Sequence, residues 1–407
     1  MSDAPGGPGG VVPPGIGRAP GRPHHWSAGG GNGRLAINQL QQQGSVDEAA
    51  VNLFLAEREI PIVEGRNCTF LFRGEADEVY LTQRIVGLPS RLPMRRVTGT
   101  TLWYVVFKVP KSSRINYQIE VVRGEHVERF NDPLNPKLSH SPFGAISVCF
   151  SFGYVDPEWT FPDPEAPPGD LAELVIQSRA LERDCQATLY LPAGFDRSTS
   201  YPLLVVHDGG DFLQYAAAKA VLDNLIHRGE IAPLIAAFLY PKDRLVEYAN
   251  SPKHALFLGS ELLPQLETDF PLIPSRSGRI LLGASFGAVA SLSAAYASPY
   301  SYGSLVLMSG SFVSADAGTD HGGGAVFDPV VRFVNRYRAR PRHVAERLFV
   351  SCGLYEPLII ANRSIVPVFE SAEMQVRYVE ARDGHTWENW RDRLRDALTW
   401  VAPGPFA

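Results

Sequence analysis

Residues 279–297 read Arg-Ile-Leu-Leu-Gly-Ala-Ser-Phe-Gly-Ala-Val-Ala-Ser-Leu-Ser-Ala-Ala-Tyr-Ala. An apolar run leads directly into a G-x-S-x-G sequence, and a run of small residues follows it. This succession predicts a strand, a sharp turn and a helix. Gly283 and Gly287 would let the strand and helix backbones approach closely, so that Ser285 is held out at the edge of a sheet. Ser285 is therefore the candidate nucleophile. The alternative is a tight turn whose serine only caps the helix.

A candidate general base lies further along the chain. The strand-like run Gln375–Glu380 leads into the loop Asp383-Gly-His-Thr386, and an amphipathic helix is expected over about 387–400. His385 should therefore follow the carboxyl end of a strand, level with the serine turn. An imidazole there can take the serine's proton and return it to the leaving group. The alternative is a surface-loop histidine beside two tryptophans.

The acid that orients this histidine is expected between the two, because the order in this class of enzyme is serine, acid, histidine. Arg347–Cys352 is a predicted strand, and the loop that follows it ends in Glu356. Glu356 is the predicted acid, with an ordinary surface carboxylate as the alternative. A Gly-rich insertion after the preceding strand also holds acids, at a less suitable edge position: Asp316, Asp320 and Asp328.

An oxyanion hole needs backbone N–H groups that point at the tetrahedral oxygen. One should come from Phe286, the residue after the nucleophile, and the other from the turn after an earlier strand. Tyr201–Asp208 is such a strand, and two glycines follow it, so the second donor is expected near Gly210. His207 and Asp208 are expected to be structural, packing and hydrogen-bonding at the base of the loop.

The N-terminal part of the chain has a different character. Residues 1–34 are dominated by Gly and Pro, which predicts a disordered tail. The capping-box pattern Ser45–Glu48 predicts a helix through about Glu57. From Cys68 onward, short β-branched and aromatic runs between turn residues predict a small all-β sandwich, so that helix and sandwich together cover 35–154. A Pro-rich linker is expected over 155–170.

Over residues 171–403 the predicted elements alternate, which favours a mostly parallel sheet with helices on both faces, the α/β-hydrolase arrangement. The strands are expected near 185–191, 203–208, 234–240, 279–283, 304–309, 347–352 and 375–380. The helices are expected near 214–228, 254–268, 286–298, 361–373 and 387–400.

Composition narrows the function classes. The 407 residues carry a formal charge of −5, which leaves no basic footprint for nucleic acid. Four scattered cysteines form no C-x-x-C pair, so neither a disulfide framework nor a zinc site is expected, and no metal or cofactor is predicted. No apolar stretch resembles a signal peptide or a membrane span, so a cytoplasmic protein without a membrane partner is expected.

With these residues in place, the chain resembles the enterochelin (enterobactin) esterase family, cytoplasmic serine hydrolases that open ferric catecholate siderophores. The resemblance spans about residues 48–400. It is carried by the segments Phe54–Glu64, Phe70–Gly74, Gly99–Trp103, Asn131–Pro136, Glu261–Pro264, Gly283–Gly287, Ser309–Ser311, Gly353–Pro357, Ala361–Asn362 and Gly384–Trp387.

The resemblance implies an immunoglobulin-like sandwich followed by an esterase domain. It places Ser285, Glu356 and His385 in the triad and implies that Arg244 and Glu247 are a substrate-side pair. Arg244 follows the strand expected at 234–240, where a guanidinium can hold an anionic or catecholate oxygen. The alternative is a structural loop arginine paired with Glu247.

The chain also departs from the family pattern. The family usually has Gly-Gly-His-Asp where this chain has Asp383-Gly-His-Thr386, and Phe312–Asp316 replaces the usual aromatic and basic residues. The expected substrate is a small-molecule ester, either a siderophore-like catecholate ester, such as a ferric siderophore, or a related aryl ester. Alternative functions are an acyltransferase, a general carboxyl or feruloyl-type esterase and a carbohydrate-binding or scaffold protein.

Overall fold

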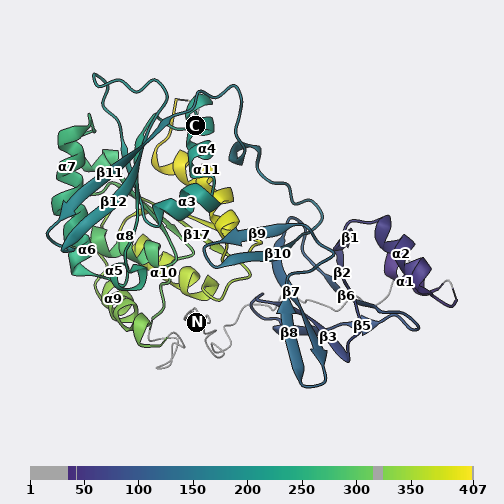
Figure 1. Cartoon of the computed structure of the whole chain (residues 1–407). Helices are drawn as coiled ribbons and strands as arrows, with labels where there is room; N and C mark the ends of the chain where they lie inside the picture. The colour runs from purple at the N-terminus through teal and green to yellow at the C-terminus, as the bar shows by residue number, and fades with distance from the viewer. Residues whose placement is uncertain (1–34, 43, 315–323, 406–407) are drawn as a thin grey trace, which may run out of the picture.

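The computed structural model describes residues 35–42, 44–314 and 324–405. The chain forms a small β part and a larger α/β part that lie against each other (Figure 1). The tail predicted over 1–34 lies outside the described residues, as do Asp316 and Asp320.

Two short helices cover the outer face of the β part. They are α1 (Ala36–Gln41) and α2 (Glu48–Ala56). The cap of α2 is Asp47, whose carboxylate accepts the Ala50 N–H at 2.8 Å. The predicted capping box starting at Ser45 is therefore displaced by two residues. Glu48 instead accepts hydrogen bonds from the backbone and hydroxyl of Thr101.

Two antiparallel sheets make the body of the β part, built from the short β-branched and aromatic runs that lie between turn residues. The first, in the order β1-β2-β6-β5, holds β1 (Ile62–Glu64), β2 (Asn67–Arg73), β5 (Arg95–Arg96) and β6 (Leu102–Lys108). The second holds β3 (Glu78–Gln83), β4 (Arg91–Pro93), β7 (Arg114–Arg123), β8 (His126–Phe130), β9 (Leu138–Ser141) and β10 (Gly144–Phe150). Side chains of both sheets share one core, in which Phe70 stacks on Phe107 and meets the edge of Tyr117. The immunoglobulin-like topology stays a prediction.

The α/β part is built on an eight-stranded sheet in the order β11-β12-β14-β13-β15-β16-β17-β18. Its strands are β11 (Asp170–Ser178), β12 (Arg183–Leu191), β13 (Leu203–Val206), β14 (Ile235–Leu239), β15 (Arg279–Ala284), β16 (Ser304–Met308), β17 (Arg347–Gly353) and β18 (Gln375–Ala381). The pairings from β14 to β18 are parallel, and those of β12 with its two neighbours are antiparallel. The carboxyl ends of the six parallel strands therefore share one edge.

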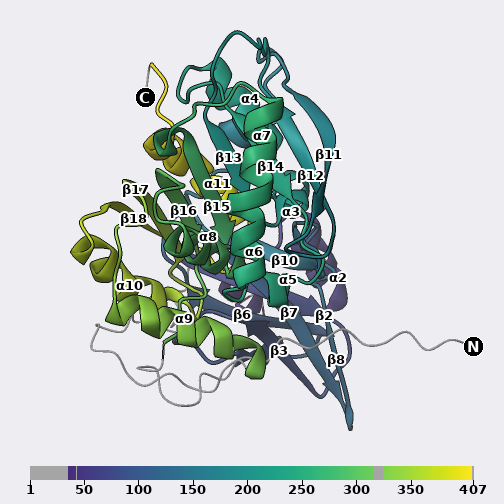
Figure 2. The same ribbon diagram turned by 90° about the vertical axis from the view of Figure 1, so that its left-hand side faces the viewer.

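Helices cover both faces of this sheet, and each face has its own apolar core. Figure 2 looks onto the face that carries α6 and α7. This face holds α5 (Arg244–Glu247), α6 (Pro252–Leu256), the π-helical turn η2 (Phe257–Leu262), α7 (Leu263–Asp269), α8 (Phe286–Ala297), α9 (Asp328–Ala339) and α10 (Ile359–Ser371). The other face holds α3 (Gly209–Tyr215), α4 (Ala218–His227) and α11 (Trp387–Val401). Short 3-10 turns are η1 (Glu158–Thr160), η3 (Arg276–Gly278) and η5 (Ala325–Phe327). Within the described ranges, none of the helices is both long and apolar enough to cross a membrane.

Several elements differ from the prediction. The helix expected over 214–228 is split into α3 and α4 by Ala217, whose backbone is left-handed at φ 47°. The helix expected over 254–268 is interrupted by the π-helical turn η2. Strand β11 and helix α9 were not predicted. Because β11 begins at Asp170, the connection between the two parts ends within the residues expected to be linker.

Candidate active site

The turn between β15 and α8 has the geometry expected of a nucleophile elbow. Ser285 adopts φ 56° and ψ −117°, a conformation that non-glycine residues rarely hold without support. A Cβ added to Gly283 would lie 2.2 Å from the carbonyl carbon of Gly287, so this close approach requires glycine at position 283. The Ser285 side chain does not cap α8. Its Oγ lies 3.3 Å from Oγ of Ser311, so the helix-cap alternative is wrong.

The structure brings the predicted acid and base into direct contact. Nδ1 of His385 lies 2.5 Å from Oε2 of Glu356. Glu356 is buried, with 1% of the residue exposed, whereas the His385 side chain is 36% exposed. Glu356 is therefore not the surface carboxylate of the alternative interpretation.

Buried donors surround Glu356. Its Oε1 accepts hydrogen bonds from Oγ of Ser309 and from the Gly353 N–H, each at 2.6 Å. Burial alone would raise the pKa of Glu356, but His385 and these two donors outweigh burial and hold the pKa below its usual value. The carboxylate is thus kept ionised beside the imidazole.

The loop after β16 supports both ends of the predicted triad. Ser309 donates to Glu356 and accepts a hydrogen bond from Nε1 of Trp390 at 3.0 Å. The ring of Trp390 meets the His385 ring edge to face, with centroids 5.1 Å apart. Ser311 contacts Ser285. Ser309 and Ser311 were not predicted as site residues, although their position just after a buried strand was a usable signal.

The predicted oxyanion donors lie in the first turns of two helices. Phe286 opens α8, and Gly210 is the second residue of α3. The first N–H groups of a helix have no partner within it, so these amides can serve a ligand. A Cβ added to Gly287 would meet His207 at 3.1 Å and Asp208 at 3.4 Å, so the two turns pack against each other. The oxyanion role of both amides stays a prediction.

Arg244 lies beside the candidate nucleophile, but its carboxylate partner is Asp208 rather than the Glu247 that the resemblance implied. Its Nε donates to both oxygens of buried Asp208, at 2.8 and 2.9 Å. It also donates to the carbonyl of Ala284 at 3.3 Å, and its guanidinium carbon lies 5.8 Å from the ring centre of Phe286. Arg244 therefore contacts both neighbours of Ser285, and a third of its side chain (33%) is exposed.

Glu247 has a different partner. Both of its carboxylate oxygens accept hydrogen bonds from Arg183 at 2.9 Å, and one also accepts the Lys242 N–H. The predicted pairing of Arg244 with Glu247 is therefore wrong, because Asp208 takes the place of Glu247.

A buried histidine pair lies under this loop. Nε2 of His207 lies 3.0 Å from Nε2 of His254, and Nδ1 of His207 lies 3.1 Å from Oγ of Ser291. Burial lowers the pKa of His207 to about 4 and also lowers the pKa of His254. Neither ring is charged at neutral pH, which fits a structural role for His207.

Comparison with known proteins identifies the class to which this geometry belongs. Residues 178–401, more than half of the chain, match the model of the family described as "Putative esterase". The chain belongs to this esterase family. It is accordingly a carboxylic ester hydrolase, as predicted.

Within the parts of the chain that the structure describes, no three His, Cys, Asp or Glu side chains are grouped to hold a metal ion.

Individual relatives confirm the predicted resemblance to the enterochelin esterases. The iron(III) enterobactin esterase of Escherichia coli is 23% identical over 332 residues, covering 75% of this chain and 80% of the relative. The crystal structure of the Shigella flexneri enterobactin esterase determined with enterobactin is 19% identical and superposes with a TM-score of 0.68, covering 87% of this chain and 98% of that one. A ferulic acid esterase, 20% identical, has a TM-score of 0.51 over 58% of this chain and 98% of its own. These structures share the fold.

Proposed function

We propose that this protein is a serine esterase that uses Ser285, His385 and Glu356 and forms an acyl-enzyme. The observation that carries the proposal is the 2.5 Å contact between Nδ1 of His385 and a buried carboxylate, next to a strained serine turn at the same sheet edge. A buried acid bound to Nδ1 fixes the tautomer whose Nε2 is free to accept a proton.

The proposed reaction uses these residues in the order of an acyl-enzyme mechanism. Nε2 of His385 takes the hydroxyl proton of Ser285 as Oγ attacks the ester carbonyl carbon. The N–H groups of Phe286 and Gly210 stabilise the negative charge on the tetrahedral oxygen. The bond to the alcohol oxygen then breaks as His385 protonates that oxygen, and a water molecule releases the acid by the same steps in reverse.

For the substrate, we propose an ester of a siderophore-like catecholate or of a related aryl acid. The relatives named above act on enterobactin or ferulic acid esters according to their names, and both classes present an aryl group near the ester. Arg244 supports the same choice, because a third of its side chain (33%) is exposed beside Ser285 and a guanidinium can hold a catecholate oxygen and stack on an aryl ring.

A fluorophosphonate probe tests the proposal directly. The intact protein should gain one adduct, located at Ser285 by peptide mass spectrometry. Ser285→Ala should lose both the adduct and about 10⁶ in kcat, without unfolding. Turnover equal to wild type in purified Ser285→Ala would overturn the assignment. A panel of siderophore, feruloyl and simple acetate esters then ranks the substrate classes by kcat/KM.

A further inference from the structure

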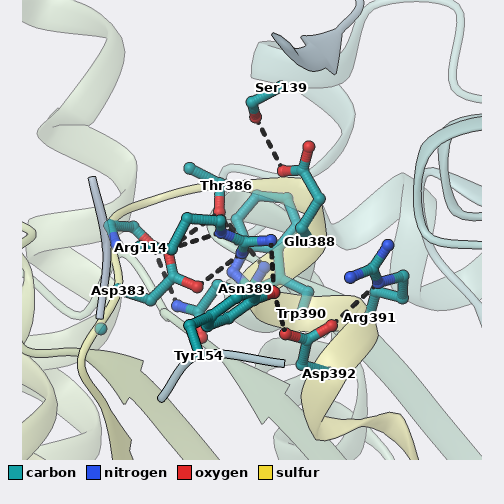
Figure 3. A network of polar contacts seen from close by, with 12 residues as sticks. Arg114, Ser139, Tyr154, Asp383, Thr386, Glu388, Asn389, Trp390, Arg391 and Asp392 are labelled. Atoms are coloured by element: carbon teal, nitrogen blue, oxygen red, sulfur yellow. Dashed lines mark hydrogen bonds and ion pairs between the residues drawn. The ribbon is translucent and has the colours of Figure 1, made fainter. Parts of the chain in front are cut away.

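The loop that carries His385 is held by the β part of the molecule. Arg114, the first residue of β7, reaches across to Asp383, two residues before His385 (Figure 3). Its Nη2 lies 2.5 Å from Oδ2 of Asp383 and 3.1 Å from Oγ1 of Thr386. The Arg114 side chain is 2% exposed and that of Asp383 is 8% exposed, so this ion pair is buried at the interface.

Asp383 also forms hydrogen bonds with both neighbours of His385. Its Oδ1 accepts the Gly384 N–H at 2.7 Å and the Thr386 hydroxyl at 3.3 Å. Thr386 in turn caps α11 by accepting the Asn389 N–H. One guanidinium therefore holds, directly or through one carboxylate, the residues before and after His385. Because the residues on both sides of His385 are held, the backbone of the loop keeps the imidazole in a narrow range of positions.

The loop that carries Glu356 is held from the same side. Tyr355 is buried in the core of the β part, and its hydroxyl lies 2.6 Å from Oγ of Ser113, the neighbour of Arg114. The Tyr355 N–H donates to the carbonyl of Asp383 at 3.0 Å, which joins the two loops. The backbone of Arg114 itself donates to the carbonyl of Arg382 at 3.0 Å.

The burial of this pair makes each partner depend on the other. Desolvation raises the pKa of Asp383 to about 6, while the adjacent Arg114 works in the opposite direction. Removal of the guanidinium would leave a buried carboxyl group without its counter-ion, and such a group must change its protonation state or its position. Either change acts on the backbone next to His385.

We propose that Arg114 is a positioning residue for the His385–Glu356 pair, so that the β part, through Asp383 and Tyr355, sets the orientation of the imidazole. The inference rests on the proposed function, since it assigns a supporting contact to that site. The carboxylate of Asp383 links the loop that carries His385 to the β part.

The test compares two arginine substitutions at the same interface in the full-length protein. Arg114→Met removes the proposed positioning contact. Arg391→Met is the matched control, since Arg391 is bound to Asp156 at 2.6 Å and to Asp392 at 2.8 Å and contacts neither neighbour of His385. For each variant, kcat and KM are measured on one aryl ester, together with Tm and the rate of fluorophosphonate labelling.

We expect Arg114→Met to lower kcat about 100-fold with KM changed less than about threefold, because a small misplacement of a catalytic group costs about that much. The labelling rate should fall in parallel. Arg391→Met should lower Tm but keep kcat within about threefold of wild type. A purely structural role would lower Tm in Arg114→Met with kcat unchanged, or lower kcat equally in both variants, and either result would overturn the inference.

Arg114→Lys keeps the test decisive if Arg114→Met does not fold. A single ammonium group keeps the charge but cannot hold Asp383 and Thr386 in the planar geometry of a guanidinium. We expect a fall in kcat of about tenfold, and wild-type kcat would overturn the inference. The proposed function fails separately, if wild-type protein is not labelled at Ser285.

Discussion

The two flanks of Ser285 are held in place by different parts of the molecule. On one flank, side chains of the β part bind the loops of Glu356 and His385. Arg114 binds Asp383, and Ser113 contacts Tyr355. On the other flank, pairs of side chains inside the α/β part hold the loops after β13 and β14.

That second flank is held by two pairs that join the end of β13 to the helices α5 and α6. Asp208 binds Arg244, and His207 lies against His254, all within the α/β part. The comparison teaches that the two halves of the proposed reaction centre have separate supports. Damage at the interface between the parts should impair proton transfer, whereas damage beneath the second flank should impair charge stabilisation or substrate binding.

The largest effect is expected from Glu356→Gln on the first flank. The amide keeps the shape of the side chain but no longer stabilises the imidazolium, so kcat should fall by up to about 10⁴. Steady-state kinetics on an aryl ester measures this. Glu380→Gln, which alters a more exposed carboxylate bound to Arg363, serves as the control. A loss below about tenfold would show that Ser285 works with His385 alone or with another acid.

Ser309→Ala should have a smaller effect on the same flank. It removes one hydrogen bond to the Glu356 carboxylate and leaves the Trp390 N–H without its acceptor. Hydrogen bonds to charged groups contribute about 2 kcal/mol, so kcat should fall about 30-fold. Tm and kcat are measured together. A fall in Tm with unchanged kcat would show that Ser309 supports only the fold.

On the second flank, the double variant Asp208→Asn with Arg244→Gln separates substrate binding from structure. It removes both charges together, so no buried carboxylate is left unpaired. We expect kcat/KM to fall about 20-fold for anionic aryl or ferric siderophore esters, because the guanidinium is lost. A neutral acetate ester should change less than about threefold. Equal losses on both substrates would show that Arg244 acts only on the fold.

The histidine pair makes the second flank sensitive to acid. The pKa of His207 is about 4 in the folded protein against 6.5 for a free side chain, so the unfolded chain binds more protons between these values. The free energy of unfolding should therefore fall as the pH drops from 6.5 toward 4, by about 1.4 kcal/mol per pH unit for each buried histidine. Urea unfolding of wild type and His254→Gln over this range measures the slope.

The variant should have the shallower slope, and identical slopes would contradict the assignment. Asp383, on the first flank, works in the opposite direction. Its pKa is raised to about 6 from 3.8, so its contribution to stability is present below pH 3.8 and is lost as the pH rises through 6. The two flanks thus titrate with opposite sign, and Asp383→Asn should steepen the acid dependence that His254→Gln reduces.

The elements that were predictable from the sequence are those that a run of neighbouring residues determines. The buried parallel strands β13 to β17 appear as continuous apolar runs, so they lie within a few residues of the predicted positions. The edge strand β18, which alternates apolar and polar residues, also lies close to its predicted position. Ser285, Glu356 and His385 follow strand ends, which is a local pattern. Strand β11 was missed because Glu173 interrupts its apolar residues and because it follows directly on the Pro-rich residues expected to be linker.

Contacts between distant segments left no such local signal. Arg114 and Asp383 are 269 residues apart, and neither is unusual in its own neighbourhood. The pairing of Arg244 with Asp208 rather than Glu247 was hidden for the same reason. Glu247 is only three residues from Arg244 in the sequence. The carboxylate that binds Arg244 is that of Asp208, which follows β13 and is distant in the sequence.

The separation of Arg114 from Asp383 also has a consequence for the order of synthesis. Ribosomes add about 5–20 residues per second, so Asp383 is made tens of seconds after Arg114, which is 269 residues earlier. During that interval the core of the β part still lacks Tyr355, and the surface around Arg114 stays hydrated until residues 383–392 emerge. With the proposed triad, a nascent chain that already displays the Ser285 turn therefore still lacks His385, and hydrolysis begins only once the last strand and helix have docked.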